Sequence, residues 1–220
     1  MTSTHIDDLA RFVTASPSSY HAAEEVARRL VEAGYLRLEE SHDWPSEPGG
    51  YVVVRDGAVI AWVIGEDASA GGFRIVGAHT DSPSLKLKPE PTSTRSGWQQ
   101  AGMEVYGGPL PNSWLDREFA LAGRIVDAHG GVHLVHTPAW LRIPQVAPHL
   151  DRSVNEKLSL DRQAHLWPVF AVGDYGADIL ALVAGTVGLG KQDVAGHDLY
   201  AAVTEKPAVF GPAGEFFASS

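Results

Sequence analysis

Residues 73–83 read FRIVGAHTDSP, and the interpretation of the whole chain starts from this stretch. The apolar run at 73–78 predicts a short strand that ends at His79. Chemistry in α/β proteins is often found where buried strands end. His79 can ligate zinc through one ring nitrogen, and Asp81 can hold the ligand geometry. A lone histidine at a strand end more often has a structural role.

Two helices are predicted upstream of this stretch. Apolar residues recur at helical spacing within 6–13 and again within 22–33. Ser18 or Ser19 can cap the second helix, and Gly34 is a natural stop. The two helices supply one helical layer for a sheet.

A hairpin is predicted between those helices and His79. Residues 51–64 read YVVVRDGAVIAWVI, which is two β-rich runs joined by Asp-Gly. Asp-Gly between such runs is a strong signal for a tight hairpin turn. Helices, hairpin and the strand before His79 together predict an α/β unit over residues 1–88.

The remainder of the chain is predicted to be mainly β. Prolines and serines punctuate residues 89–96, which indicates a crossing between two units. Beyond the crossing we expect one helix and four strands, at 177–187 for the helix and at 104–106, 119–126, 132–136 and 197–203 for the strands. The fold class is therefore α/β, with a partial α/β unit over 1–88 followed by a β-rich unit over 89–220.

Composition restricts the classes of partner. The net charge of −10 repels phosphate backbones and anionic lipids, so we expect no nucleic acid and no membrane partner. The apolar runs are too short to span a bilayer. The N-terminus has no apolar signal segment, and the chain has no cysteine, which fits a reducing cytoplasm. Any zinc must be held by His, Asp or Glu.

Four segments, in chain order, resemble the aspartyl aminopeptidase family of zinc metallopeptidases. They are SPSSYH, GAHTDSPSLKLKP, SWLDREFALAGR and IPQVAPHLDRSVNE, at 16–21, 77–89, 113–124 and 143–156. The resemblance implies a zinc-exopeptidase catalytic domain, present in part over 1–88, followed by an inserted β-rich oligomerisation domain over 89–220. It also implies a cytoplasmic homo-oligomer that removes N-terminal Asp or Glu from peptides with two Zn²⁺ per active site.

The resemblance also assigns site residues. It implies that His79 is a zinc ligand and that Asp81 is the supporting catalytic carboxylate. His149 matches a histidine that reaches an active site, possibly that of a neighbouring subunit, and whether it ligates metal or contacts substrate stays open. His129, His133 and His136 could form a ligand cluster, but His133 and His136 have no obvious carboxylate partner in the sequence, and we expect the three to be solvated or structural.

The sequence offers too few residues for a complete hydrolytic site. Such a site needs about three protein ligands per zinc and a carboxylate base, whereas only His79 and His149 match. The family carries its bridging Asp and its Glu-Glu pair in the second half. We therefore expect a truncated, inactive N-terminal half. The alternatives are a non-catalytic assembly module of the same family and an unrelated β-rich binding protein with coincidental motifs.

Overall fold

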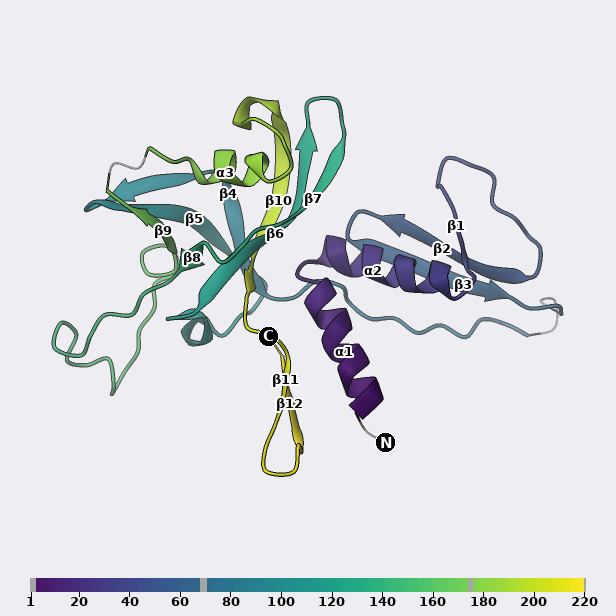
Figure 1. The fold of residues 1–220 in the computed structure, drawn as a ribbon, viewed down its shortest axis with the longest axis horizontal. Coiled ribbons are helices and arrows are strands. Elements are labelled where there is room, and N and C mark those ends of the chain that lie inside the picture. Colours follow the sequence, from purple (N-terminus) through teal and green to yellow (C-terminus); the bar gives the residue numbers. More distant parts are fainter. Residues whose placement is uncertain (1–2, 68–70, 174–175, 220) are drawn as a thin grey trace. The chain divides into compact units, whose positions relative to one another are not determined.

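The computed structural model describes residues 3–67, 71–173 and 176–219. The chain forms two compact units (Figure 1). The first contains Met1–Ser82 and Pro207–Phe217, and the second contains Pro83–Lys206 and Ala218–Ser220. The change from one unit to the other comes between Ser82 and Pro83, six residues before the predicted position, because the segment beyond Pro83 is the first strand of the second sheet.

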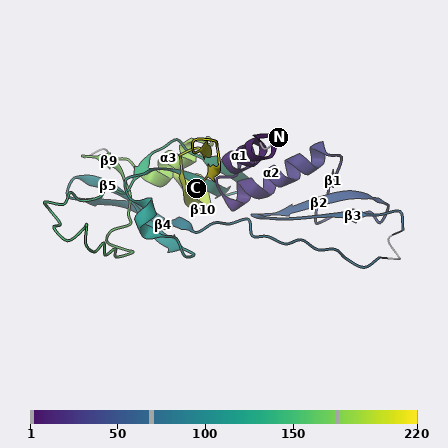
Figure 2. The ribbon, with the colours of Figure 1, turned by 90° about the horizontal axis from the view of Figure 1, so that it is seen from below.

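The first unit is a helical layer on a small sheet. Ser18 caps α2 by accepting a hydrogen bond from the His21 amide, and Gly34, at φ 93°, ends the turn after it. Figure 2 shows α2 lying along one face of the sheet, whose strand order is β1-β2-β3. The elements are α1 (Ser3–Ala15), α2 (Ser19–Glu32), β1 (Leu36–Arg37), β2 (Gly49–Arg55) and β3 (Ala58–Ile64).

Small side chains set the contact between α2 and its sheet. Ala23 and Ala27 are fully buried, and Val52 on β2 is buried as deeply. The predicted apolar stripe included Val26, which is only half-buried. Alanine allows the helix to approach the sheet closely, so the deepest packing follows the small residues.

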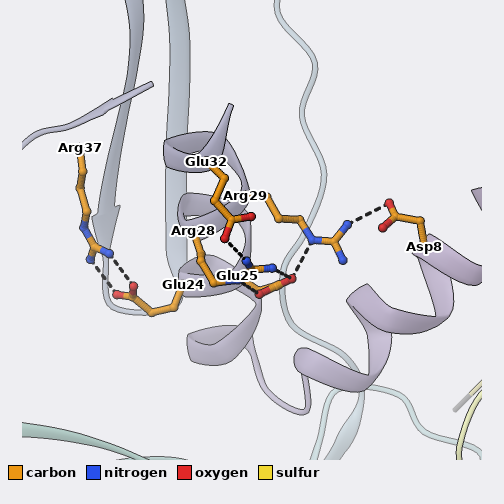
Figure 3. A network of polar contacts seen from close by, with 7 residues as sticks. All are labelled: Asp8, Glu24, Glu25, Arg28, Arg29, Glu32 and Arg37. Carbon is orange, nitrogen blue, oxygen red and sulfur yellow. Dashed lines mark hydrogen bonds and ion pairs between the residues drawn. The ribbon is translucent and has the colours of Figure 1, made fainter. Parts of the chain in front are cut away.

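An ion-pair network fastens α2 to its neighbours (Figure 3). Glu25 is only 10% exposed and accepts hydrogen bonds from Arg28 and from Arg29, both at 2.7 Å. Arg29 also reaches Asp8 of α1 at 3.0 Å. At the other side of α2, Glu24 forms a two-pronged pair with Arg37 of β1; its contacts are 2.6 and 2.8 Å. The network therefore ties two helices and a strand together.

The strand predicted before His79 is wrong. Residues 72–82 are coil, and the apolar side chains of Phe73, Ile75 and Val76 are 96%, 85% and 98% exposed. Among the described residues, the three-stranded sheet ends at β3. In that part of the chain this strand pairs only with β2, so the run at 73–76 pairs with no strand. An apolar run without a neighbouring strand has nothing to satisfy its backbone groups as a ladder, so it stays extended coil.

The second unit is an antiparallel sheet that closes on itself. Its order is β10-β4-β5-β9-β8-β6-β7, and β10 pairs additionally with β6. The core is a single cluster that includes Leu87, Met103, Phe119, Leu121 and Leu199. The elements are β4 (Ser84–Arg95), β5 (Trp98–Tyr106), β6 (Glu118–Asp127), β7 (Val132–His136), β8 (Leu141–Arg142), β9 (Val169–Val172), α3 (Ile179–Gly185) and β10 (Val194–Val203), with short 3-10 turns at Pro111–Trp114 and Lys191–Asp193.

The region predicted as a crossing between units, residues 89–96, is instead most of a strand. The β4–β5 register shifts between Leu87 and Thr92, and Pro89 and Pro91 lie in that irregularity. Proline lacks the N–H that a ladder needs, so a break in register is where a strand tolerates it. The bounds of β7 are those predicted, 132–136, and the other three predicted strands extend beyond their predicted ranges.

The C-terminal residues form a hairpin of β11 (Ala208–Phe210) and β12 (Phe216–Ala218). Phe210 and Phe216 stack across it, their ring centroids 5.1 Å apart. Within the described part of the chain, no helix has the length and apolarity needed to cross a membrane.

Replacing Gly123 by alanine should weaken the second unit severely. A Cβ at Gly123 would lie 1.9 Å from the carbonyl oxygen of Asp198, and the residue has φ 150°. Because backbone cannot move aside as a side chain can, we expect a loss of at least about 2 kcal/mol in unfolding free energy. Gly196→Ala is the matched control, since its Cβ would meet nothing within 4 Å. Equal denaturant midpoints for the two variants would contradict the close approach.

Glu25→Gln should destabilise the first unit in a pH-dependent manner. Hydrogen bonds from Arg28, opposed by burial and aided by Arg29, lower the pKa of Glu25 from 4.5 to about 2. The folded state therefore favours the carboxylate, so its stabilisation is present above about pH 4.5 and disappears as pH falls toward 2. We expect a loss of about 1 kcal/mol at pH 7 that shrinks on acidification. Glu32→Gln, at an exposed partner of Arg28, should change little.

Candidate functional site

The His79 segment is fastened to the turn of the β2–β3 hairpin. The Thr80 hydroxyl donates a hydrogen bond of 2.6 Å to the carbonyl oxygen of Gly57. Asp56, the other residue of this turn, adopts φ 55°, which Asp tolerates better than most residues. This contact gives the coil a defined position against its own unit although it belongs to no strand.

His79 and Asp81 lie together. The Nδ1 atom of His79 is 2.6 Å from the carbonyl oxygen of Asp81 and 3.7 Å from its Oδ1. A carbonyl oxygen only accepts, so Nδ1–H is the donor in this contact, which in the neutral ring leaves the lone pair on Nε2. This is how zinc-ligating histidines are usually oriented. The His79 side chain is 80% exposed, so its geometry fits one metal ligand that faces solvent.

His149 belongs to the other unit. It is exposed and lies on a loop between β8 and β9, residues 143–168. Short turns organise this loop, in which the carboxylates of Asp151 and Asp161 accept hydrogen bonds from backbone N–H groups two or three residues further on. The structure thus brings His79 and Asp81 together, whereas the role of His149 at a site stays a prediction.

The histidines of β7 serve the sheet. His133 Nε2 lies 2.8 Å from Oδ2 of Asp127, a carboxylate partner that sequence reasoning missed. Hydrogen bonds from His133 and from the backbone N–H groups of Gly131 and His129 lower the pKa of Asp127 to about 2. Burial lowers the pKa of His136. The signal for Asp127 was available, because it begins the β6–β7 turn and hairpin pairing places His133 beside that turn.

A hydrolytic zinc site requires a cluster of ligands. Among residues 3–67, 71–173 and 176–219, no group of three or more His, Asp or Glu side chains is arranged to hold a metal ion. The segment at 77–81 therefore supplies one well-oriented imidazole and a neighbouring carboxylate.

Comparison with known proteins gives this arrangement its context. The sequence profile of the M18 peptidases, described as aminopeptidase I zinc metalloproteases, matches residues 12–220. Because the match covers nearly the whole sequence, the chain belongs to peptidase family M18, a family of metalloaminopeptidases.

The curated relatives are about twice as long as this chain. A probable M18 family aminopeptidase 2 of Streptomyces coelicolor is 46% identical over 212 residues, which cover 94% of this chain and 49% of the relative. A probable aspartyl aminopeptidase of Ricinus communis is 34% identical, and the alignment covers 96% of this chain and 53% of the relative. The chain thus spans about half the length of the relatives it matches.

Solved structures show the same relation. The chain matches one from the cryo-EM structure of the Ape4 and Nbr1 complex with a TM-score of 0.88 and 32% identity, covering 96% of this chain and 46% of that one. An M18 aminopeptidase from Thermotoga maritima has a TM-score of 0.80 at 20% identity, which shows the fold alone. The α/β architecture is therefore that of part of an M18 aminopeptidase.

His79→Ala should leave the stability of the chain unchanged. The side chain is largely exposed, so we expect a change within about 0.5 kcal/mol in unfolding free energy. Thr80→Val is the matched neighbour. It loses the hydrogen bond to Gly57 and should cost about 1 kcal/mol. Chemical denaturation of both variants makes the comparison, and a His79→Ala loss as large as that of Thr80→Val would mean that His79 is structural.

Proposed function

We propose that this chain supplies the N-terminal part of a zinc aminopeptidase that removes acidic residues, Asp or Glu, from peptide N-termini. The observation that carries the proposal is the match of residues 12–220 to family M18. The preference for acidic residues is supported by the Ricinus communis relative, which is named an aspartyl aminopeptidase. A cytoplasmic location is part of the proposal, and the cysteine-free sequence fits a reducing compartment.

His79, Asp81 and His149 take distinct roles in this proposal. His79 ligates zinc through Nε2 while the Asp81 carbonyl oxygen holds Nδ1–H, an arrangement that fixes the ring. Asp81 supports that ligand with its side chain. His149 completes a site as a ligand or as a substrate contact, and the exposed loop that carries it suits a site on a neighbouring subunit. Zinc, with two ions per site, supplies an activated water and stabilises developing charge.

The chain alone is proposed to be inactive. The apolar side chains of Phe73, Ile75 and Val76, just before the metal segment, are almost fully exposed. Soluble proteins rarely leave such a run uncovered, and the relatives carry a second half of similar length. We propose that sequence equivalent to this second half covers the run and brings the missing ligands and the carboxylate base.

The second candidate function is a non-catalytic assembly module. It is favoured by the second unit, which has its own core and a sheet closed by β10, and so has the features of an independently stable unit. One solved relative is described as the mApe1 dodecamer of S. cerevisiae, which supports a homo-oligomer, and we propose that the second unit mediates it. Zinc content separates the two functions, because an assembly module needs no stoichiometric zinc.

Reconstitution tests the proposed function. The chain is assayed with zinc and aspartyl, glutamyl and leucyl chromogenic substrates, alone and co-purified with the unmatched half of the Streptomyces coelicolor relative. We expect no turnover by the chain alone, turnover by the complex with the acidic substrates preferred, and a loss of at least about 10²-fold in the complex with His79→Ala.

The relative's two halves, co-purified in the same way, are the positive control, and metal analysis gives zinc per complex. Turnover by the chain alone that disappears in His79→Ala would show that the chain contains its own base. An assembled complex that neither holds stoichiometric zinc nor hydrolyses any of the substrates, beside an active control, would favour the assembly module.

A further inference from the structure

The loop that carries His149 is a long excursion from the second sheet. It runs from Ile143 to Pro168, and the strand residues at its two ends, Arg142 and Val169, pair with each other. Figure 1 shows this segment, here named the arm, as the green loop below β8 and β9. Loops of this length without secondary structure are uncommon in compact domains and are usually functional.

The exposed part of the arm has the character of a contact surface. Leu150, beside His149, is 74% exposed, and Val146 and Leu158 are also exposed. A flexible segment of this length would visit many directions, and ordering it against a site would cost conformational entropy. The arm is useful for presenting His149 only if its attachment to the sheet restricts those directions.

Asp116 makes that attachment where the arm begins. Its backbone N–H donates to the carbonyl oxygen of Ile143 at 2.8 Å, and its Oδ1 accepts from the N–H of Gln145 at 3.1 Å. The guanidinium of Arg142 lies 3.5 Å from the same oxygen. Asp116 thus contacts Arg142, Ile143 and Gln145, the residues that lead into the exposed stretch from Val146 onward.

The conformation of Asp116 makes this double contact possible. Its φ is 56°, in the left-handed region that Asp and Asn tolerate better than other non-glycine residues. The residue before it, Leu115, is buried and forms a parallel bridge with Ile143. Trp114 packs on Phe119 of β6 with a centroid distance of 5.2 Å. The residues before Asp116 thus pack against the core, and the hydrogen bonds of Asp116 fix the first residues of the arm relative to that core.

The returning limb of the arm is held separately. The side chain of Gln163 donates to Glu104 at 2.8 Å and accepts from Lys88 at 2.8 Å. Lys88 also lies over the ring of Trp167, 4.6 Å from its centroid. These contacts fix the end near Pro168, so the contacts of Asp116 decide the direction at the other end, nearest His149.

We propose that Asp116 is a positioning residue that sets the direction in which the arm leaves the sheet and thereby where His149 is presented. Asp116 acts through the backbone of Ile143 and Gln145 and contacts no reacting group. The functional consequence rests on the proposed function, in which His149 completes an active site.

Three substitutions separate the parts of this contact. Asp116→Asn keeps the Oδ1 acceptor and the tolerance for φ 56°. Asp116→Gly keeps only the tolerance, and Asp116→Ala keeps neither. Ser96→Gly is the matched control, because Ser96 is a positive-φ residue (φ 50°) in the β4–β5 turn of the same unit.

Hydrogen exchange on the 220-residue chain gives the first readout. We expect the Gln145 amide to lose protection about threefold to tenfold in Asp116→Gly and Asp116→Ala, as for one lost hydrogen bond, with Asp116→Asn and Ser96→Gly close to wild type. Unchanged Gln145 protection in Asp116→Gly overturns the proposal, whatever the chain does as an enzyme.

The reconstituted complex gives the second readout. We expect kcat/KM to fall about tenfold to a hundredfold in Asp116→Gly and to be restored in Asp116→Asn. Full activity in Asp116→Gly would contradict the proposal that Asp116 determines where the arm places His149. A wild-type complex without hydrolysis counts against the proposed function instead, and the exchange result then decides the positioning role on its own.

Discussion

The pairing of β10 with both β4 and β6 is the constraint on which the second unit depends. Each strand edge carries N–H and C=O groups that need partners, and closing the ring β10-β4-β5-β9-β8-β6 gives each of these strands a neighbour on both sides, whereas β7 pairs with β6 alone in the described residues. Here the closure is possible because Gly123 lets the backbone of β6 come against the carbonyl of Asp198. Once the ring is closed, β8 and β9 have fixed places in it, and both ends of the arm that bears His149 are fixed with them.

In the first unit, by contrast, a sheet edge stays without a partner strand in the described part of the chain. Its sheet ends at β3 among the described residues, and the apolar run at 73–76 lies exposed beside no registered strand. The segment at 77–81 nevertheless has local order, because the Thr80 hydroxyl is hydrogen-bonded to the Gly57 carbonyl and the ring of His79 to the carbonyl of Asp81. Local contacts of this kind need only a few neighbouring residues, whereas burying an apolar run needs a whole layer.

That difference explains what the sequence could and could not predict. The Ser18 cap, the Gly34 stop and the Asp-Gly hairpin are local signals, and the structure contains all three. The prediction of a strand at 73–78 was wrong because an apolar run indicates a tendency to be buried but does not tell whether a partner strand lies beside it. The prolines of β4 were misread because tolerance for them depends on the β5 register. Closure by β10 and the Asp116 contacts to the arm join residues that are distant in sequence, so no local signal predicts them.

The division of site residues between two units has a consequence under the proposed function. Zinc binds where several ligands converge, and its binding free energy stabilises whatever arrangement brings them together. If His79 contributes one ligand and the remainder come from other segments, zinc affinity and assembly are linked, so each strengthens the other. His79 is then better exposed than buried before assembly, because an unliganded imidazole exposed to water costs little. Read alone, the exposure of His79 would argue for an inert surface residue; under the proposed function, its hydrogen bond to the Asp81 carbonyl orients the ring in the way that a zinc ligand needs.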